Sequence, residues 1–263
     1  PNGTTDGGDP VTTPPATNAT TTTTPLDSLP DCPVDALDTA AGPVEITLWH
    51  GLNTDNETAI ERVTDEYNAS QDRVVVRAEN QGGYLETIDK YFQSGTGDRP
   101  AIVMFPDYSA QRAIDSEAVI PVAACTDAAA YDLGDFQPSA IAAYSQAGVQ
   151  WGMPFNVSNP VLYYNRNMFV AAGLDPDRSP QSLEELREYS QQLVDSGAAA
   201  YGIAIDSGAD SGGGWYLEQW FANMGELYAD NGNGRLAPAT KVLYDGPAGV
   251  AMLSYVQGLI TDG

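Results

Sequence analysis

The sequence predicts an α/β fold of two lobes, with mostly parallel sheets flanked by helices. Between residues 44 and 105, strand-like segments alternate with segments of helical periodicity, which is the element order of a helix-covered parallel sheet. The run Trp151–Asn165, which holds prolines and asparagines, then leads to further strand and helix patterns. We therefore expect a first lobe over residues 44–153. A hinge crossing and a partial second lobe should follow over residues 154–263.

The first lobe is expected to alternate strands and helices. Strand patterns cover residues 44–48, 73–78 and 101–105. The last of these runs is apolar throughout, which is typical of a strand buried on both faces. Thr54 and Glu57 have capping-box spacing, so Thr54 is expected to cap the first helix. A second helix should follow the break at Gly82–Gly83 and end near Gly95.

Three loops leave the carboxyl ends of these strands. They hold His50 to Asn53, Gly82 to Tyr84, and Pro106 to Tyr108. Ligands of open α/β sheets bind beyond the carboxyl ends of the strands. The topology therefore predicts that the three loops meet on one ligand-facing rim.

The second lobe is expected to contain two short strands, Val161–Tyr164 and Tyr201–Ile205. Ser182 should cap a helix between them, with Glu185 three residues on. Two more helices are predicted over residues 215–224 and 247–259. Two strands are too few for a complete sheet, so we expect this lobe to be incomplete and to continue downstream.

The composition excludes several classes of partner and chemistry. A net charge of −25 repels nucleic acid and anionic membrane surfaces, and indicates solubility in a salty or extracellular setting. Two cysteines and one histidine are too few for a zinc cluster. Neither a P-loop nor a nucleophile elbow is present. We predict no catalytic residue, no metal and no cofactor.

Cys32 and Cys125 lie far apart in the sequence, each next to the edge of an element. We predict that they form a disulfide, the alternative being two buried free thiols. A disulfide would indicate an oxidising, extracytoplasmic compartment. Residues 1–43 are predicted to be a disordered Thr/Pro-rich tether with a lead-in to the first lobe, because the tether is almost free of apolar side chains. We find no signal peptide and no apolar run long enough to cross a bilayer.

Several motifs resemble those of one protein family: Leu48-Trp49-His50, Tyr67-Asn68, Gly83-Tyr84, Pro154–Asn165 and Ala172–Pro176. These motifs are similar to those of the extracellular solute-binding proteins of ABC importers, in the sugar and glycerol-3-phosphate receptor group. Within that group they most resemble the glycerol-3-phosphate and glycerophosphodiester receptors. The likeness covers roughly Val44 to Gly263, and Pro154–Asn165 is its most specific part.

The resemblance implies a type II periplasmic-binding fold whose lobes close over a small polar solute. A glycerol phosphate or glycerophosphodiester is expected first, and a mono- or oligosaccharide second. It also implies an ABC permease as membrane partner, a monomer, and a periplasmic or cell-surface location with an N-terminal lipid anchor. The family is longer than this chain, and the arginine that grips phosphate would lie in the part beyond it.

The first lobe offers three candidate ligand residues. Tyr84 could stack on a ligand and hydrogen-bond to it, and the matching family position is a ligand tyrosine. Asp107 could accept hydrogen bonds from hydroxyl groups or attract a quaternary ammonium, and the glycerol-3-phosphate receptor has an acidic residue at the matching place. His50 could donate to a ligand oxygen. The alternatives are a packing tyrosine, a turn-forming aspartate and a satisfied structural histidine.

The crossing and the second lobe offer three more. Ser158 matches a ligand-contacting serine of the family, and Asn156 is its weaker companion. Both could instead satisfy the backbone where the chain changes lobes. Trp215 is expected to provide an aromatic platform, with Trp220 as its competitor and core burial as the alternative for either.

Two other function classes remain open from the sequence. A secreted carbohydrate-active enzyme would need two carboxylates at glycosidase spacing, and no pair stands out among so many acidic residues. A ligand-binding sensor domain would need a downstream transmembrane helix in the full gene.

Overall fold

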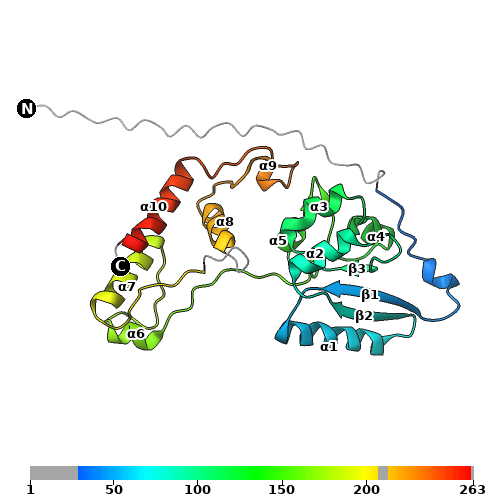
Figure 1. Ribbon diagram of the computed structural model, residues 1–263, viewed down its shortest axis with the longest axis horizontal. Coiled ribbons are helices and arrows are strands. Elements are labelled where there is room, and N and C mark those ends of the chain that lie inside the picture. The colour runs from blue at the N-terminus through cyan, green and yellow to red at the C-terminus, as the bar shows by residue number, and fades with distance from the viewer. Residues whose placement is uncertain (1–28, 207–212, 262–263) are drawn as a thin grey trace, which may run out of the picture.

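The computed structural model describes residues 29–206 and 213–261 (Figure 1). In Figure 1 the sheet and helices α1 to α5 form one group, and helices α6, α7 and α10 form another. A long extended segment joins the two groups. Most of the predicted tether, residues 1–28, lies outside the described residues.

The first lobe contains the predicted parallel sheet, with strand order β2-β1-β3. Its strands are β1 (Val44–His50), β2 (Val74–Asn80) and β3 (Ile102–Val103). Helices α1 (Thr54–Ser70) and α2 (Tyr84–Gln93) connect them, and the register pairs Val44 with Val74 and Leu48 with Ile102. Figure 1 shows α1 on one side of the sheet and α2 on the other. All three strands therefore end at the same edge.

Two local predictions for this lobe are wrong. The third strand is only two residues long and Ile102 is exposed, because β3 is an edge strand that pairs with β1 alone. The N-cap of α1 is Asn53 rather than Thr54. The Glu57 carboxylate does not close a capping box, since it accepts a hydrogen bond from Asn80 Nδ2 at 2.6 Å.

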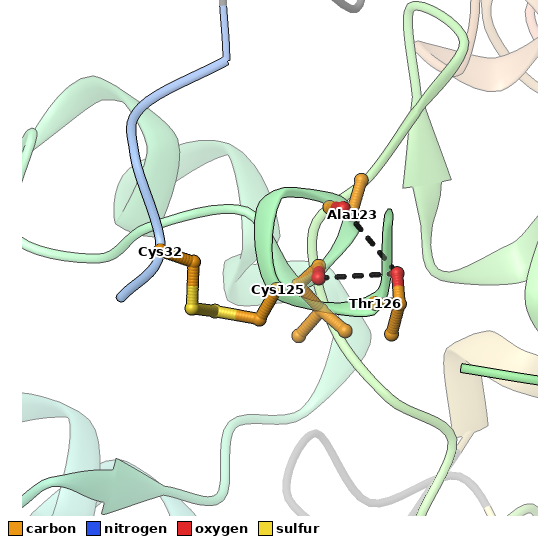
Figure 2. The surroundings of a disulfide bond; sticks show 5 residues. Cys32, Ala123, Cys125 and Thr126 are labelled. Atoms are coloured by element: carbon orange, nitrogen blue, oxygen red, sulfur yellow. Dashed lines mark hydrogen bonds between the residues drawn. A yellow bond between two sulfur atoms is a disulfide. The ribbon is translucent and has the colours of Figure 1, made fainter. Parts of the chain in front are cut away.

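The first lobe continues with three short helices and a hairpin. They are α3 (Ala110–Asp115), α4 (Val122–Ala128), α5 (Pro138–Ala143), β4 (Ser145–Gln146) and β5 (Val149–Gln150). The structure contains the predicted disulfide, which joins Cys32 of the lead-in to Cys125 on α4 with an S–S distance of 2.11 Å (Figure 2). The described part of the lead-in is thus fixed to the body of the first lobe.

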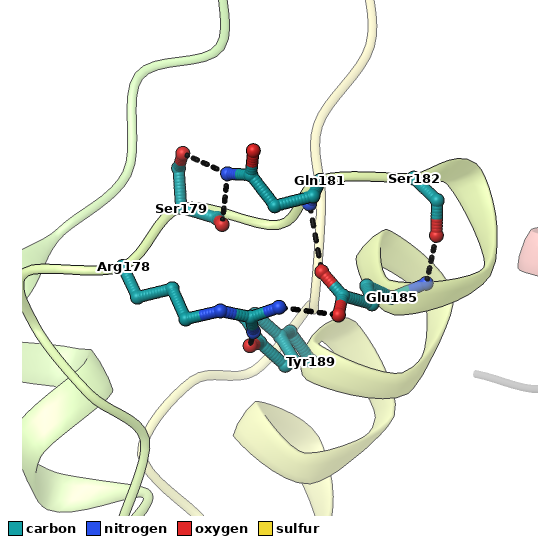
Figure 3. A network of polar contacts seen from close by, with 6 residues as sticks. All are labelled: Arg178, Ser179, Gln181, Ser182, Glu185 and Tyr189. Atoms are coloured by element: carbon teal, nitrogen blue, oxygen red, sulfur yellow. Dashed lines mark hydrogen bonds and ion pairs between the residues drawn. The ribbon is translucent and has the colours of Figure 1, made fainter.

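The described part of the second lobe is helical. It holds α6 (Arg166–Ala171), α7 (Leu183–Asp195), α8 (Gly213–Asn223), α9 (Asp230–Asn233) and α10 (Pro247–Thr261). Its core cluster consists of Phe169, Ala172 and Leu193. The predicted cap is confirmed, because Ser182 Oγ accepts a hydrogen bond from Glu185 N at 3.1 Å (Figure 3). Arg178 bonds to both the Glu185 carboxylate and the Tyr189 hydroxyl and ties the preceding loop to α7.

The two strands predicted for the second lobe, Val161–Tyr164 and Tyr201–Ile205, do not form. Both segments are non-helical, and the Tyr163 side chain is 90% exposed. A strand needs a neighbouring strand for its N–H and C=O groups. Within the described part of this lobe, the pairing is limited to an isolated bridge between Ala229 and Val242. Strand-like composition without a partner therefore leaves these segments as extended coil.

Candidate functional site

The loops after β1 and β2 touch through their backbones. A Cβ atom on Gly51 would lie 2.4 Å from the carbonyl carbon of Gly83 and 2.7 Å from the amide nitrogen of Tyr84. Contacts this short leave room only for glycine. In addition, Gln81 N donates a hydrogen bond to the carbonyl oxygen of His50 at 2.9 Å. These two loops form one rim, which places Tyr84 at the start of α2 and at the edge of the sheet.

Asp107 follows β3 and begins a 3-10 turn at the same edge of the sheet. Its Oδ2 lies 3.6 Å from Nη2 of Arg235, which comes from the loop after α9, on the far side of the crossing in sequence. The partly buried Tyr144 has a raised pKa. Burial is the main cause, Asp107 and Tyr84 raise it further, and Arg235 opposes them. Tyr84, Asp107 and Arg235 therefore lie near enough to Tyr144 to act on it electrostatically, although the four residues are distant in sequence.

Helix α8 adds a second carboxylate to this group. The pKa of Glu218 is raised by partial desolvation and then by the negative charge of Asp107, while Arg235 lowers it. Trp215 lies three residues before Glu218 on α8, so the two side chains share a helix face. Trp215 is 49% exposed. We call these six residues the interlobe cluster: Tyr84, Asp107, Tyr144, Trp215, Glu218 and Arg235.

The two tryptophan candidates differ in their surroundings. Trp220 is half-buried and meets Tyr255 of α10 edge-on, with ring centroids 6.1 Å apart. It packs between the helices of the second lobe. Trp215 has the exposed face that a stacking platform needs, which supports Trp215 over its competitor.

His50 lies at the end of β1 with only 1% of its surface exposed. Its Nδ1 accepts a hydrogen bond from Leu52 N at 3.3 Å. This placement supports the structural alternative for His50, because a ligand would reach the ring only after the loop had moved.

Asn156 and Ser158 are exposed on the extended crossing between the lobes. Among the described residues, no hydrogen bond or ion pair joins either side chain to the interlobe cluster. Their ligand role therefore stays a prediction, as does that of the other four candidates.

Sequence reasoning missed Tyr144, Glu218 and Arg235. The fold brings Arg235 to the first lobe through its backbone, since Ala147 N donates to Arg235 O at 2.7 Å. The Asp107–Arg235 ion pair depends on this long-range return of the chain. The available sequence signal was weak: a cation after a glycine- and asparagine-rich turn in a very acidic chain.

The interlobe cluster combines two carboxylates, one guanidinium and three aromatic rings. Carboxylates accept hydrogen bonds from hydroxyl groups, a guanidinium binds anions, and aromatic faces stack on sugars or cations. Within the described ranges, no group of three histidine, cysteine or acidic side chains could hold a metal ion. The arrangement is suited to binding a small polar solute.

An apolar cavity in the described residues lies elsewhere. It has a volume of about 560 Å³ and lies between α7, α8 and α10, beside the extended segment 201–206. Ile203, Leu217 and Leu259 are typical of its largely apolar lining. Such walls suit hydrophobic packing rather than the capture of a polar solute, so we place the candidate site at the interlobe cluster.

The buried His50 predicts a measurable pH dependence of stability. Burial lowers its pKa in the folded state from 6.5, against the opposing effect of Glu57 and Glu61. The unfolded state then binds more protons, so stability is full above the unfolded pKa and is lost as the pH falls through it. Between about pH 7.5 and 5.5, where few other groups titrate, the melting temperature of the wild type should fall more than that of His50→Gln. Equal falls would contradict the burial of a neutral imidazole.

Residues 62–263 match the family model of the bacterial extracellular solute-binding protein. This match covers more than half of the chain. The chain belongs to this family. The predicted resemblance to extracellular solute-binding proteins is thereby confirmed. None of the helices in the described ranges is long and apolar enough to cross a membrane.

Curated relatives include sn-glycerol-3-phosphate-binding periplasmic proteins from several bacteria. The protein of Brucella abortus is 26% identical over 225 residues, which cover 83% of this chain and 51% of the relative. The protein of Rhizobium meliloti is 28% identical, with 85% of this chain and 52% of the relative covered. The chain therefore spans about half the length of these relatives.

Solved structures show the same fold. The cyclic alpha-maltosyl-1,6-maltose binding protein from Arthrobacter globiformis is 26% identical, with a TM-score of 0.57 over 84% of this chain and 55% of the other. UgpB from Mycobacterium tuberculosis, solved in complex with glycerophosphocholine, is 23% identical, with a TM-score of 0.60 over 84% of this chain and 54% of the other. The predicted periplasmic-binding α/β fold is confirmed.

Proposed function

We propose that this chain belongs to the substrate-binding subunit of an ABC importer, which captures a small polar solute without catalysis. The observation that carries the proposal is the interlobe cluster, because its polar and aromatic side chains come from both sides of the crossing. A solute bound there contacts both lobes only when they are closed. Binding would therefore shift the population from open to closed forms.

The chemistry of the interlobe cluster favours a glycerol phosphate or glycerophosphodiester. Arg235 offers a cation to a phosphate group, while Asp107 offers a carboxylate to the glycerol hydroxyls. Trp215 and the two tyrosines could stack on a sugar ring or a quaternary ammonium. The names of the curated relatives support this class. A mono- or oligosaccharide is the second ligand class, in keeping with the maltosyl-maltose binding protein of the same fold.

Family membership and the disulfide support a location outside the cytoplasm. We propose that an N-terminal lipid tethers the protein to the membrane, that it acts as a monomer, and that an ABC permease recognises its closed form.

A thermal-shift screen of the full-length protein tests the function. Glycerol-3-phosphate, glycerophosphocholine or a maltosaccharide should raise the melting temperature, because a ligand that binds only the folded state adds stability as its concentration exceeds Kd. At about 100 times Kd the gain is ~2.7 kcal/mol. A protein that none of these solutes stabilises, and that cleaves a glycan instead, would contradict solute capture and support the enzyme alternative.

A further inference from the structure

Arg235 is delivered to the first lobe by a loop whose backbone is held in place. Ala147 N donates to Arg235 O at 2.7 Å, and Gln146 Nε2 donates to Gly234 O at 3.1 Å. Gly234, which ends α9, has a φ of 78°, a left-handed conformation that glycine adopts without strain. Because the backbone is already fixed, a ligand that binds the guanidinium has less chain to order.

The ion pair between Arg235 and Asp107 is loose. The 3.6 Å between Nη2 and Oδ2 exceeds the roughly 2.7–2.9 Å of a charge-assisted hydrogen bond. The two side chains are 37% and 48% exposed. Exposed ion pairs of this kind add little stability, so another anion can replace Asp107 at the guanidinium.

An anionic solute needs a cation at this place. The chain has a net charge of −25, which repels anions, and the interlobe cluster adds two carboxylates of its own. In the described part of the chain, Arg235 is the cation whose charge lowers the pKa of both Tyr144 and Glu218. Its planar guanidinium matches the geometry of phosphate oxygens better than an ammonium does.

We infer that Arg235 is a residue through which this protein selects anionic solutes over neutral ones. On binding, its guanidinium exchanges Asp107 for the phosphate group of the solute, and the released carboxylate accepts hydrogen bonds from solute hydroxyls. A neutral sugar leaves the ion pair intact. The inference rests on the proposed function and names a residue that contributes to its specificity.

Calorimetric titration of the full-length protein tests the inference. Arg235→Gln should raise Kd for glycerol-3-phosphate and glycerophosphocholine roughly 10- to 100-fold, as expected for the loss of a hydrogen bond to a charged group. Kd for a neutral maltosaccharide should stay within about twofold. Arg235→Lys keeps the positive charge but loses the planar guanidinium that can donate two parallel hydrogen bonds. It should bind phosphate compounds with intermediate affinity.

Arg62→Gln is the matched control, because it makes the same change in an exposed α1 pair with Glu66 and should leave every Kd unchanged. Unchanged affinity of Arg235→Gln for phosphate compounds overturns the inference and leaves solute capture standing. A wild-type protein that binds only neutral sugars would overturn the inference in the same way. An equal loss of affinity for neutral and anionic solutes in Arg235→Gln would do so as well. A wild type that binds none of the solutes contradicts the proposed function as well.

Discussion

Loss of the disulfide in the double variant Cys32→Ser/Cys125→Ser is expected to lower the free energy of unfolding by roughly 4–5 kcal/mol in the chain-entropy model. The bond closes a loop whose ends are 93 residues apart, and long loops lose the most entropy on closure. Within the described residues, the lead-in also reaches the sheet through an exposed ion pair between Arg73 and Asp38 at 2.7 Å, which contributes little. The disulfide should therefore account for nearly all of the attachment.

Urea unfolding of the full-length protein without reductant, followed by far-UV circular dichroism, measures this effect. Val34→Ser is a suitable control, because Val34 is an exposed lead-in residue close to Cys32. Its free energy of unfolding should stay within about 0.5 kcal/mol of the wild-type value. A double variant that unfolds at the wild-type urea concentration would show that the lead-in does not depend on the bond.

Gly51→Ala is expected to damage both stability and binding. The added Cβ would lie 2.4 Å from a backbone carbon of Gly83, and backbone cannot rotate away as a side chain does. Forcing the two rim loops apart should cost about 1–3 kcal/mol of folding free energy. It should also move Tyr84, whose amide nitrogen lies 2.7 Å from the new atom. We expect ligand affinity to fall about tenfold or more, since displacements near 1 Å have large effects on positioned groups.

Gly97→Ala provides the matched control, because a Cβ there meets no atom within 4 Å. Thermal melts and calorimetric titration of both variants separate the two effects. If Gly51→Ala melted and bound like Gly97→Ala, the contact between the rim loops would not exist in solution.

The sequence predicted the parts of the fold that local patterns determine. The alternation at Val44, Ile46 and Leu48 and the break at Gly82–Gly83 are local features, and the elements they predict are present. Strand pairing is a non-local property, so the apolar pattern at Val161–Tyr164 could not show that its backbone lacks a partner.

The candidate site likewise contains some residues that strand topology places and others that only long-range contacts place. Tyr84 and Asp107 follow parallel strands, so topology alone places them at one edge of the sheet. Arg235 reaches that edge because the chain after α9 bonds back to the β4–β5 hairpin. No motif in the sequence encodes this return, and the burial of His50 likewise depends on how the loop after β1 packs.

The distance between the lobes tests the central claim most directly. The cysteines of the described residues are both in the disulfide, so spin labels at Val63→Cys on α1 and Val170→Cys on α6 would report on the two lobes without interference from them. Saturating glycerol-3-phosphate should convert the interlabel distances of the full-length protein into one narrower and shorter distribution. Ligand binding with an unchanged distribution would contradict capture by closure of the two lobes.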